Sequence, residues 1–249
     1  MLSNNPFKVH GINYLSPSSI NTYISDTPMW VARYLFKVRS SSGAGAVRGI
    51  ASEFVLANKY KEGKFDYDLL NMKFMTLCTE SMIDLGDAKT EKERGLLKRF
   101  GEVIDNNFAY ENLEDYQEKV EVQLDDLPVP IMGYLDFRFK DKIVDLKTST
   151  RMPSQPTEAQ KRQMALYSMA YPKNSVDLFF ATPKEHKVFT LKNLTSYKKQ
   201  LEKVAYSIQK FLSISNDKHE LASFVYPNLD SWMWNGKMKE EAKKIWSVK

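Results

Sequence analysis

Residues 133–147 have the sequence Gly-Tyr-Leu-Asp-Phe-Arg-Phe-Lys-Asp-Lys-Ile-Val-Asp-Leu-Lys. Two apolar-rich runs are joined by the polar turn Lys140-Asp141-Lys142, a pattern that predicts a β-hairpin. Side chains two positions apart on a strand share a face. We therefore expect Asp145 and Lys147 to point the same way, while Leu146 points into the core.

Charged side chains at the end of this hairpin give the first functional hypothesis. Asp136 lies in the first strand, and Asp145 and Lys147 close the second. Desolvating two carboxylates and an ammonium is costly without a compensating partner, and oxygen ligands of this kind suit Mg²⁺ or Mn²⁺. The pattern predicts a metal site that cleaves phosphodiester bonds. The alternative is a solvated charge pair, which is what an isolated Asp-x-Lys at a strand end more often is.

Five short segments between residues 15 and 167 occur in the order typical of one nuclease family. They are Leu15-Ser16-Pro17-Ser18-Ser19-Ile20 followed by Tyr23, Arg48-Gly49-Ile50-Ala51-Ser52-Glu53, Gly133-Tyr134-Leu135-Asp136, Asp145-Leu146-Lys147-Thr148, and Gln163-Met164-Ala165-Leu166-Tyr167. This set resembles the RecB-like branch of the PD-(D/E)xK nuclease superfamily. That branch includes phage recombination exonucleases and CRISPR-adaptation nucleases.

The resemblance implies an α/β fold with a restriction-endonuclease-like core. In such a core a central mixed β-sheet is flanked by helices, and a helical N-terminal region precedes it. We expect one nuclease domain over residues 1–249. Its helical N-terminal part covers residues 15–113, its catalytic sheet and helix residues 116–192, and its C-terminal helices residues 193–249.

The resemblance also implies a ligand set for Mg²⁺ or Mn²⁺. Its members are the side chains of Glu53, Asp136 and Asp145 and the backbone carbonyl of Leu146. Lys147 is expected to position or deprotonate the attacking water and to offset charge in the transition state. Whether one metal ion binds or two stays open.

Further site residues follow from the same resemblance. Gln163 and Tyr167 are one helical turn apart and share a helix face, which we expect to border the active site. A purely structural role for Tyr167 as a core aromatic is the alternative. Contacts to DNA are expected from Arg48, Ser16, Ser18, Thr148 and Ser149. An arginine or a hydroxyl on a loop more often has no such role.

The chain departs from many relatives at the cysteines that bind an iron–sulfur cluster. The place of the first cysteine is taken by Asp26-Thr27-Pro28, and Cys78 is the single cysteine of the chain. Such a cluster needs four thiolates, so we expect none here.

Composition sets broad bounds on the protein. The 249 residues are 43% hydrophobic and 27% charged, as in ordinary soluble globular proteins. A net charge of +5 suits a polyanionic partner such as DNA. No apolar run reaches the roughly 18 residues needed to span a bilayer, and Met1 to His10 lack the apolar core of a signal peptide. We expect no membrane association and a cytoplasmic location in a bacterium or a phage-infected host.

The order of elements can be predicted along the chain. A helix is expected to start at Ser16 or Ser18, and residues 40–45 read as a flexible connection. Residues 66–113 look helical, with a charge-rich break over residues 84–94. Strands are expected over residues 116–124, 175–182 and 186–191, in addition to the central hairpin, and a long helix over residues 195–213.

Two classes of function remain open. The first is a metal-dependent exonuclease that acts on linear DNA and produces single-stranded tails for recombination or repair, with an endonuclease or nickase as its enzymatic alternative. The second is a noncatalytic DNA-binding module on a nuclease fold, although the intact ligand set disfavours it. Whether a single-strand annealing or recombinase protein is a partner of the first, and whether the chain forms a homo-oligomer, stays open.

Overall fold

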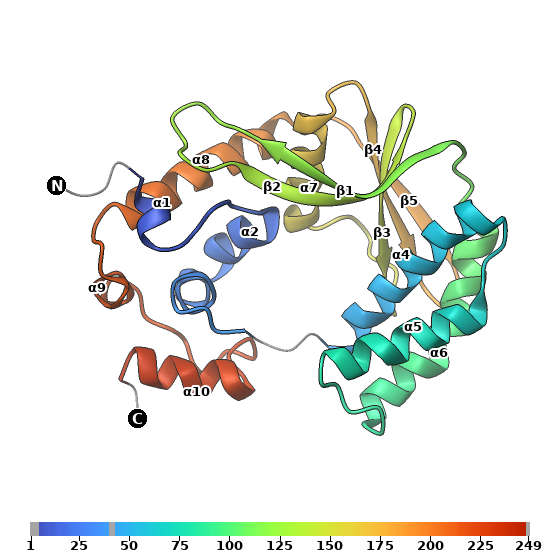
Figure 1. Ribbon diagram of the computed structural model, residues 1–249, viewed down its shortest axis with the longest axis horizontal. Coiled ribbons are helices and arrows are strands. Elements are labelled where there is room, and N and C mark those ends of the chain that lie inside the picture. Colours follow the sequence, from blue (N-terminus) through green and yellow to red (C-terminus); the bar gives the residue numbers. More distant parts are fainter. Residues whose placement is uncertain (1–4, 40–42, 248–249) are drawn as a thin grey trace.

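The sheet is the part of the fold that local sequence patterns predict most directly. The computed structural model describes residues 5–39 and 43–247. Five strands within this part lie side by side in chain order, namely β1 (Leu113–Val122), β2 (Ile131–Phe139), β3 (Lys142–Thr148), β4 (Ser175–Ala181) and β5 (His186–Leu191). Strands β3 and β4 are parallel, and the other neighbouring pairs are antiparallel. The expected α/β fold with a central mixed sheet is confirmed (Figure 1).

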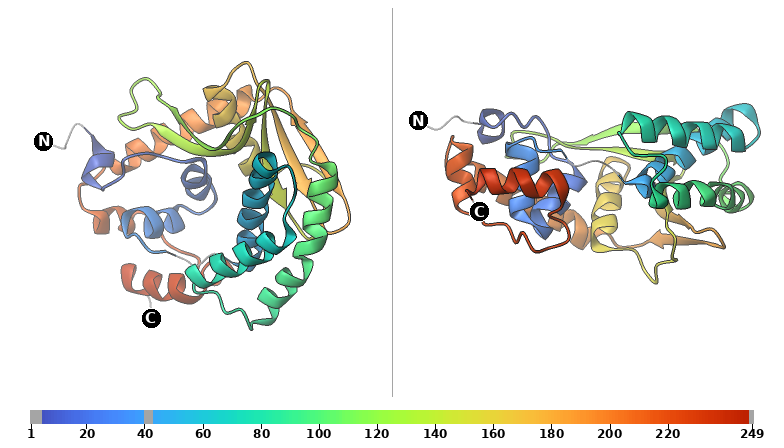
Figure 2. Two further views of the ribbon diagram at one scale, coloured as in Figure 1. Left: turned by 45° about the vertical axis from the view of Figure 1, so that its right-hand side comes forward. Right: turned by 90° about the horizontal axis from the view of Figure 1, so that it is seen from below.

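Helices cover both faces of this sheet (Figures 1 and 2). They are α4 (Ala44–Glu62), α5 (Tyr67–Glu80) and α6 (Ala88–Asn107) on one face, and α7 (Glu158–Ala170) and α8 (Thr195–Leu212) on the other. Phe137, Val144 and Phe179 belong to the core beneath α4–α6. Ile143 and Leu178 belong to the core beneath α7 and α8. No helix in the described part of the chain has both the length and the apolar character needed to cross a bilayer.

Near the middle of strands β1 and β2, the regular alternation of side chains between the two cores is broken. Leu135 packs in the α7–α8 core, whereas Phe137, only two positions later, packs in the α4–α6 core. Regular alternation would place both on one face. On β1, Gln117 lies opposite this point and has a left-handed backbone with φ of 54°. The two-stranded ribbon therefore turns over at Gln117 and Asp136, which brings Asp136 to the boundary between the two cores.

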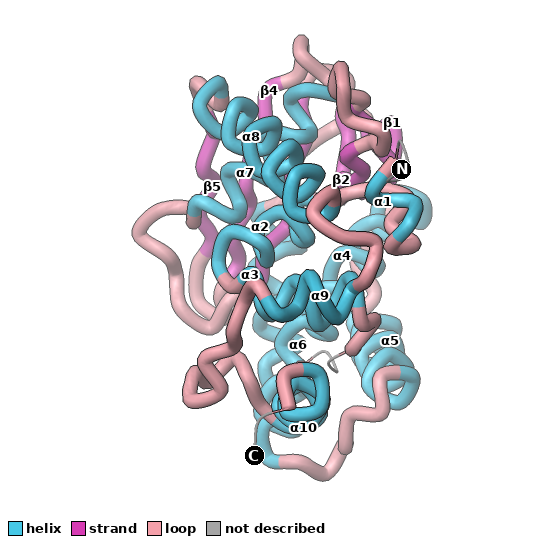
Figure 3. The backbone as a smooth tube through the Cα atoms, turned by 90° about the vertical axis from the view of Figure 1, so that its left-hand side faces the viewer, coloured by secondary structure: helices cyan, strands magenta, loops and turns pink. Residues whose placement is uncertain are grey.

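Short helices from both ends of the chain pack together (Figure 3). They are α1 (Pro6–Val9), α2 (Pro17–Ser25), α3 (Thr27–Trp30), the π-helical turn η1 (Val31–Leu35), α9 (Lys218–Ser223) and α10 (Gly236–Ile245). Helices α1 and α2 pack against α8, and α9 and α10 pack against η1, the turn that follows α3. Helix α2 starts as predicted, because Ser16 caps it and Pro17 occupies its first position. Trp234 donates a hydrogen bond from its indole nitrogen to Asp26 at 2.9 Å. This contact ties the C-terminal segment to the helical N-terminal region.

Two sequence expectations about connections need correction. Of the connection expected over residues 40–45, residues 40–42 lie outside the described residues, but Ala44 and Gly45 already belong to α4. The charge-rich break expected over residues 84–94 is shorter, because Asp87 caps α6 and accepts hydrogen bonds from the backbone of Lys89 and Thr90. An acidic N-cap starts the helix inside the charged run.

Candidate active site

Asp136 lies where strand β2 separates from strand β3. Pairing of the two strands ends at Phe137 with Val144. Beyond that pair, the backbone N–H of Leu146 donates to Oδ2 of Asp136 at 2.9 Å. Burial, together with the negative charges of Asp145 and Glu53, raises the pKa of Asp136 well above its ordinary value. A carboxyl group in this state gains from any cation placed beside it.

Asp145 and Lys147 alternate with Leu146 on β3. Leu146 is buried in the α4–α6 core, and Asp145 is fully buried. The ammonium of Lys147 lies 2.6 Å from Oδ2 of Asp145. Burial of Lys147 opposes its charge, but the attraction of Asp145 and Asp136 outweighs that effect and raises the pKa of Lys147. The predicted side-by-side placement of this carboxylate and ammonium is therefore present.

Helix α7 supplies a second set of contacts to the same strand. The side-chain amide of Gln163 donates to Oδ1 of Asp145 at 3.1 Å and to the hydroxyl of Tyr167 at 2.8 Å. That hydroxyl donates to the backbone carbonyl of Tyr134 on β2 at 2.5 Å. Tyr167 is also a buried core aromatic. Gln163 and Tyr167 thus connect α7 to both strands that carry the acidic residues.

Glu53 approaches from α4, on the other side of the sheet. Its Oε2 accepts a hydrogen bond from the side-chain amide of Gln117 at 3.3 Å. Burial is the main cause that raises the pKa of Glu53 to about 7; Lys147 opposes the rise and Asp145 adds to it. Glu53 therefore interacts electrostatically with the charged pair on β3 even though it comes from a different layer.

The chemistry of these donors fits a divalent cation. Glu53, Asp136 and Asp145 are hard oxygen donors, and burial together with neighbouring carboxylates raises the pKa of Glu53 and Asp136. Among the described residues, no three acidic, histidine or cysteine side chains are already arranged so that they could hold a metal ion. Gln117 holds Glu53, and Lys147 holds Asp145. A bound cation would have to share or replace these two contacts.

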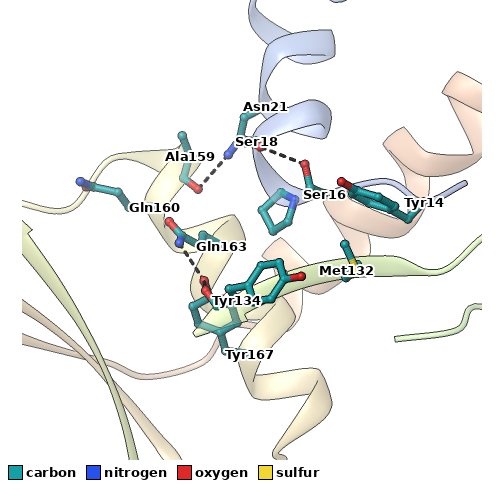
Figure 4. A pocket seen from close by; sticks show the side chains of 12 residues that line it. Tyr14, Ser16, Ser18, Asn21, Met132, Tyr134, Ala159, Gln160, Gln163 and Tyr167 are labelled. Carbon is teal, nitrogen blue, oxygen red and sulfur yellow. Dashed lines mark hydrogen bonds between the residues drawn. The ribbon is translucent and has the colours of Figure 1, made fainter. Parts of the chain in front are cut away.

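A cavity of about 450 Å³ opens beside Gln163 and Tyr167 (Figure 4). Its wall also includes Ser16 and Ser18 at the start of α2, and their hydroxyl oxygens are 2.9 Å apart. Asn21 on α2 donates to the backbone carbonyl of Ala159 at 3.1 Å, which joins α2 to the start of α7. The structure thus brings Ser16 and Ser18 to the same opening as Gln163, although about 145 residues separate them in the sequence.

Arg48 is placed differently from its expected role in DNA contact. It is buried, donates to the hydroxyl of Thr148 at 3.3 Å and to its carbonyl at 3.2 Å, and pairs with Glu93 on α6. Its guanidinium also stacks over Phe100 at 4.2 Å. These contacts involve all three guanidinium nitrogens of a buried side chain, so Arg48 joins α4, α6 and the end of β3. The hydroxyl of Ser149 donates to the carbonyl of Arg151 at 2.8 Å.

Sequence reasoning missed two contributors to the site. Gln117 orients Glu53, but nothing in the sequence near it indicates a left-handed residue within a strand. Tyr134 contributes its backbone carbonyl, an atom that every residue carries. The position of Tyr134 within the predicted Gly-x-x-Asp strand is the one available signal, because it places that carbonyl two residues before Asp136.

One solved structure has a fold similar to that of this chain. No protein-family model and no curated protein matches the sequence. Among solved structures, the chain is similar to a candidate exonuclease from Eubacterium rectale, with a TM-score of 0.55 and 12% identity over 94% of this chain and 92% of that chain. A second structure, that of SSO0001, has a TM-score of 0.34 and 12% identity over 75% of this chain and 81% of that chain, which is too low to support an argument. At 12% identity, the first likeness shows that the two chains share a fold.

Proposed function

We propose that this chain is a metal-dependent DNA exonuclease that hydrolyses phosphodiester bonds of linear DNA and leaves single-stranded tails. One observation carries the proposal: Asp136, Asp145 and Lys147 lie together where β2 leaves β3, with Gln163 bound to Asp145. The bare sequence pattern left a solvated charge pair as the alternative. Full burial of Asp145 argues against that alternative.

Glu53, Asp136 and Asp145 are the side chains that would hold Mg²⁺ or Mn²⁺, with the backbone carbonyl of Leu146 as a further oxygen donor. When bound, such an ion acts as a Lewis acid toward the phosphate and lowers the pKa of water. The chain contributes a fixed geometry for these donors. The Leu146 N–H positions Asp136, Gln163 positions Asp145, and Gln117 positions Glu53.

In this proposal, Lys147 is the positively charged side chain that acts on the reacting phosphate. Its ammonium is held against Asp145 and its side chain is partly exposed, so a substrate can approach it in the site. There it would orient the attacking water and offset the negative charge that builds on the phosphoryl oxygens. Because that charge is largest in the transition state, removing Lys147 should affect turnover more than binding.

The cavity beside Gln163 is the place where we expect the DNA backbone to enter. Ser16 and Ser18 offer hydroxyl groups on one wall, and Tyr134, which is half-exposed, lies on another. Hydroxyl groups and backbone N–H groups are common phosphate contacts that carry no sequence information. Cleavage without sequence preference follows from such a lining.

Exonuclease activity is preferred over endonuclease activity on two grounds. The structural neighbour is named as a candidate exonuclease, and the sequence contains no motif that would read a DNA sequence. A single-strand annealing or recombinase protein would be the natural recipient of the tails. An endonuclease or nickase that uses the same residues is the second candidate.

Digestion of matched DNA substrates tests the proposal. End-labelled linear duplex and covalently closed circular duplex of the same sequence are incubated with Mg²⁺, and parallel samples contain EDTA. We expect progressive loss of the linear form with Mg²⁺, an intact circle, and no reaction in EDTA. Cutting of the circle as fast as the linear form would show an endonuclease, and robust cleavage in EDTA would rule out the metal mechanism.

A further inference from the structure

A second hollow, of about 640 Å³, lies beyond the end of strand β3 and is separate from the cavity beside Gln163. Helix α6 forms one wall, the loop after β3 forms another, and the turn between β4 and β5 closes it. We call it the distal groove. Its lining includes Lys92, Leu96, Arg99, Arg151, Met152 and Lys184.

The distal groove has an excess of positive charge. Lys92, Arg99, Arg151 and Lys184 are all exposed, and none of them forms an ion pair within the described part of the chain. The one acidic residue of the lining is Glu185. Four unpaired cations from three separate elements attract a polyanion.

Two apolar side chains of the lining, Leu96 and Met152, which we call the apolar floor, restrict the kind of polyanion that fits. Lys92, Leu96 and Arg99 are spaced four and three residues apart, so they share one face of α6. Leu96 therefore lies between two cations, and Met152 from the loop after β3 belongs to the same lining. A duplex would present only its phosphates to such a surface. A single strand can place its phosphates on the cations and its bases on the apolar floor.

The groove is close to the candidate active site and is firmly attached to it. Thr150 lines the groove and follows Lys147 by three residues, a distance of at most about 10 Å along an extended chain. The buried Arg48 bonds to Thr148 and pairs with Glu93, the neighbour of Lys92 on α6. This network holds the wall of the groove against the end of β3.

We propose that the distal groove binds single-stranded DNA next to the scissile phosphate, as a site for one separated strand during digestion. The proposal rests on the proposed nuclease function for its biological meaning, but it concerns binding and can be tested without cleavage. Phosphates lie along Arg99, Arg151, Lys92 and Lys184, and bases pack on Leu96 and Met152. A strand held there keeps the DNA end in place between successive cleavage events.

The test compares two double variants with equal loss of charge. Arg99→Gln with Arg151→Gln changes the groove. Lys140→Gln with Lys173→Gln changes exposed cations at the opposite end of β3 and β4. Both pairs are made in a Lys147→Ala chain, so that the DNA is not consumed. Affinity for fluorescein-labelled oligothymidylate and for a blunt duplex of equal length is measured by fluorescence anisotropy over a range of salt concentrations.

We expect the groove variant to bind the single strand about tenfold more weakly. The slope of log K against log [salt] should become shallower by about 1.4, because each of the two lost phosphate contacts removes about 0.7 from it. Duplex affinity should change less than threefold, and the control variant should bind as the parent does. A folded groove variant with unchanged single-strand affinity and salt dependence would overturn the proposal. Equal weakening for duplex and single strand would overturn the assignment to single strands.

Folding and function are controlled separately. Circular dichroism and thermal unfolding report whether each variant is folded, and Lys92→Gln with Lys184→Gln provides a second groove variant with the same expectation. If the unmodified chain does not cut DNA with Mg²⁺, the proposed nuclease function is wrong, but the proposal that the distal groove binds single-stranded DNA still stands. If the unmodified chain cuts DNA but both groove variants bind the single strand as their parent does, the groove proposal is wrong and the proposed nuclease function stands.

Discussion

Each acidic residue of the candidate site is held by at least one polar partner. The Leu146 N–H holds Asp136, Lys147 holds Asp145, and Gln117 holds Glu53. The first two partners lie within a few residues of the motif, so a local sequence pattern could predict them. Gln117 could not be predicted, because its role depends on a left-handed conformation that the sequence around it does not require.

Replacing Gln117 by glycine should separate stability from activity. Glycine adopts a φ of 54° without steric cost, so Gln117→Gly should raise the free energy of unfolding by about 1 kcal/mol. It also removes the hydrogen bond to Glu53, and DNA cleavage at limiting Mg²⁺ should slow about tenfold and recover at saturating Mg²⁺.

Asn193→Gly is the matched control, because Asn193 has a φ of 56° and lies on the surface away from these carboxylates. It should be stabilised in the same way and cleave at the unmodified rate. Urea unfolding and initial rates across a Mg²⁺ titration measure both effects. A Gln117→Gly protein with an unchanged rate at limiting Mg²⁺ would contradict the orienting role.

Glu53 should make the metal-free protein less stable as pH rises. Its pKa is about 7 in the folded chain against an ordinary value of 4.5, so between these pH values the folded state keeps a proton that the unfolded state loses. Stability is therefore lost as pH rises from about 4.5 to 7, by at most about 3 kcal/mol. Below this window both states are protonated, and Glu53 contributes nothing.

The measurement is urea unfolding in EDTA at pH 5 and pH 7.5, for the unmodified protein and for Glu53→Gln. The variant should gain stability relative to the unmodified protein at pH 7.5 and much less at pH 5. If the stability of the two proteins depends on pH in the same way, the pKa of Glu53 is not raised in the folded chain. Mg²⁺ at pH 7.5 should stabilise the unmodified protein, because a ligand that binds only the folded state adds to its stability.

At the scale of elements, the position of α7 depends on a glycine in β2. A side-chain carbon on Gly133 would lie 3.0 Å from Leu166 and 3.3 Å from Tyr167, both on α7. Gly133→Ala should therefore push α7 away from the sheet, at a cost of about 1–3 kcal/mol in stability. Because Gln163 moves with the helix, DNA cleavage should fall as well.

Gly95→Ala is the control for this change. Gly95 lies within α6, and a side-chain carbon there meets no other atom within 4 Å. Alanine should stabilise that helix by about 0.5–1 kcal/mol and leave cleavage unchanged. Thermal unfolding and initial cleavage rates measure both variants. If Gly133→Ala is as stable and as active as the unmodified protein, α7 does not depend on close packing at this position.

Elements with a strong local pattern were predicted well, and elements defined by distant contacts were not. The hairpin and strand β5 follow from alternating apolar residues and turn signals, and β5 has the predicted bounds. Arg48 was expected to contact DNA, and its buried contacts were not predicted because its partners, Glu93 and Thr148, are 45 and 100 residues away. The reversal of the β1–β2 ribbon was not predicted, because strict alternation was assumed along each strand.

At the scale of the whole molecule, the candidate site lies where the two cores meet. Glu53 comes from the α4–α6 layer and Gln163 from the α7–α8 side, and the ribbon reverses between them at Asp136. Only the folded chain brings these groups together, so no single motif shows the site. The cavity is lined by residues of α2, β2 and α7 and the distal groove by residues of α6, the loop after β3 and the β4–β5 turn, so DNA that occupied both would contact several separate elements.

The central claim is that this cluster of acidic residues and Lys147 cuts DNA. The most direct test measures single-turnover cleavage and binding of end-labelled linear duplex by the unmodified protein, by Lys147→Ala and by Lys140→Ala, a control at the exposed β2–β3 turn. With Mg²⁺, Lys147→Ala should cleave at least about a hundredfold more slowly but bind DNA with similar affinity in Ca²⁺, and Lys140→Ala should match the unmodified protein. Cleavage by Lys147→Ala at the unmodified rate would contradict the account and place the active site elsewhere.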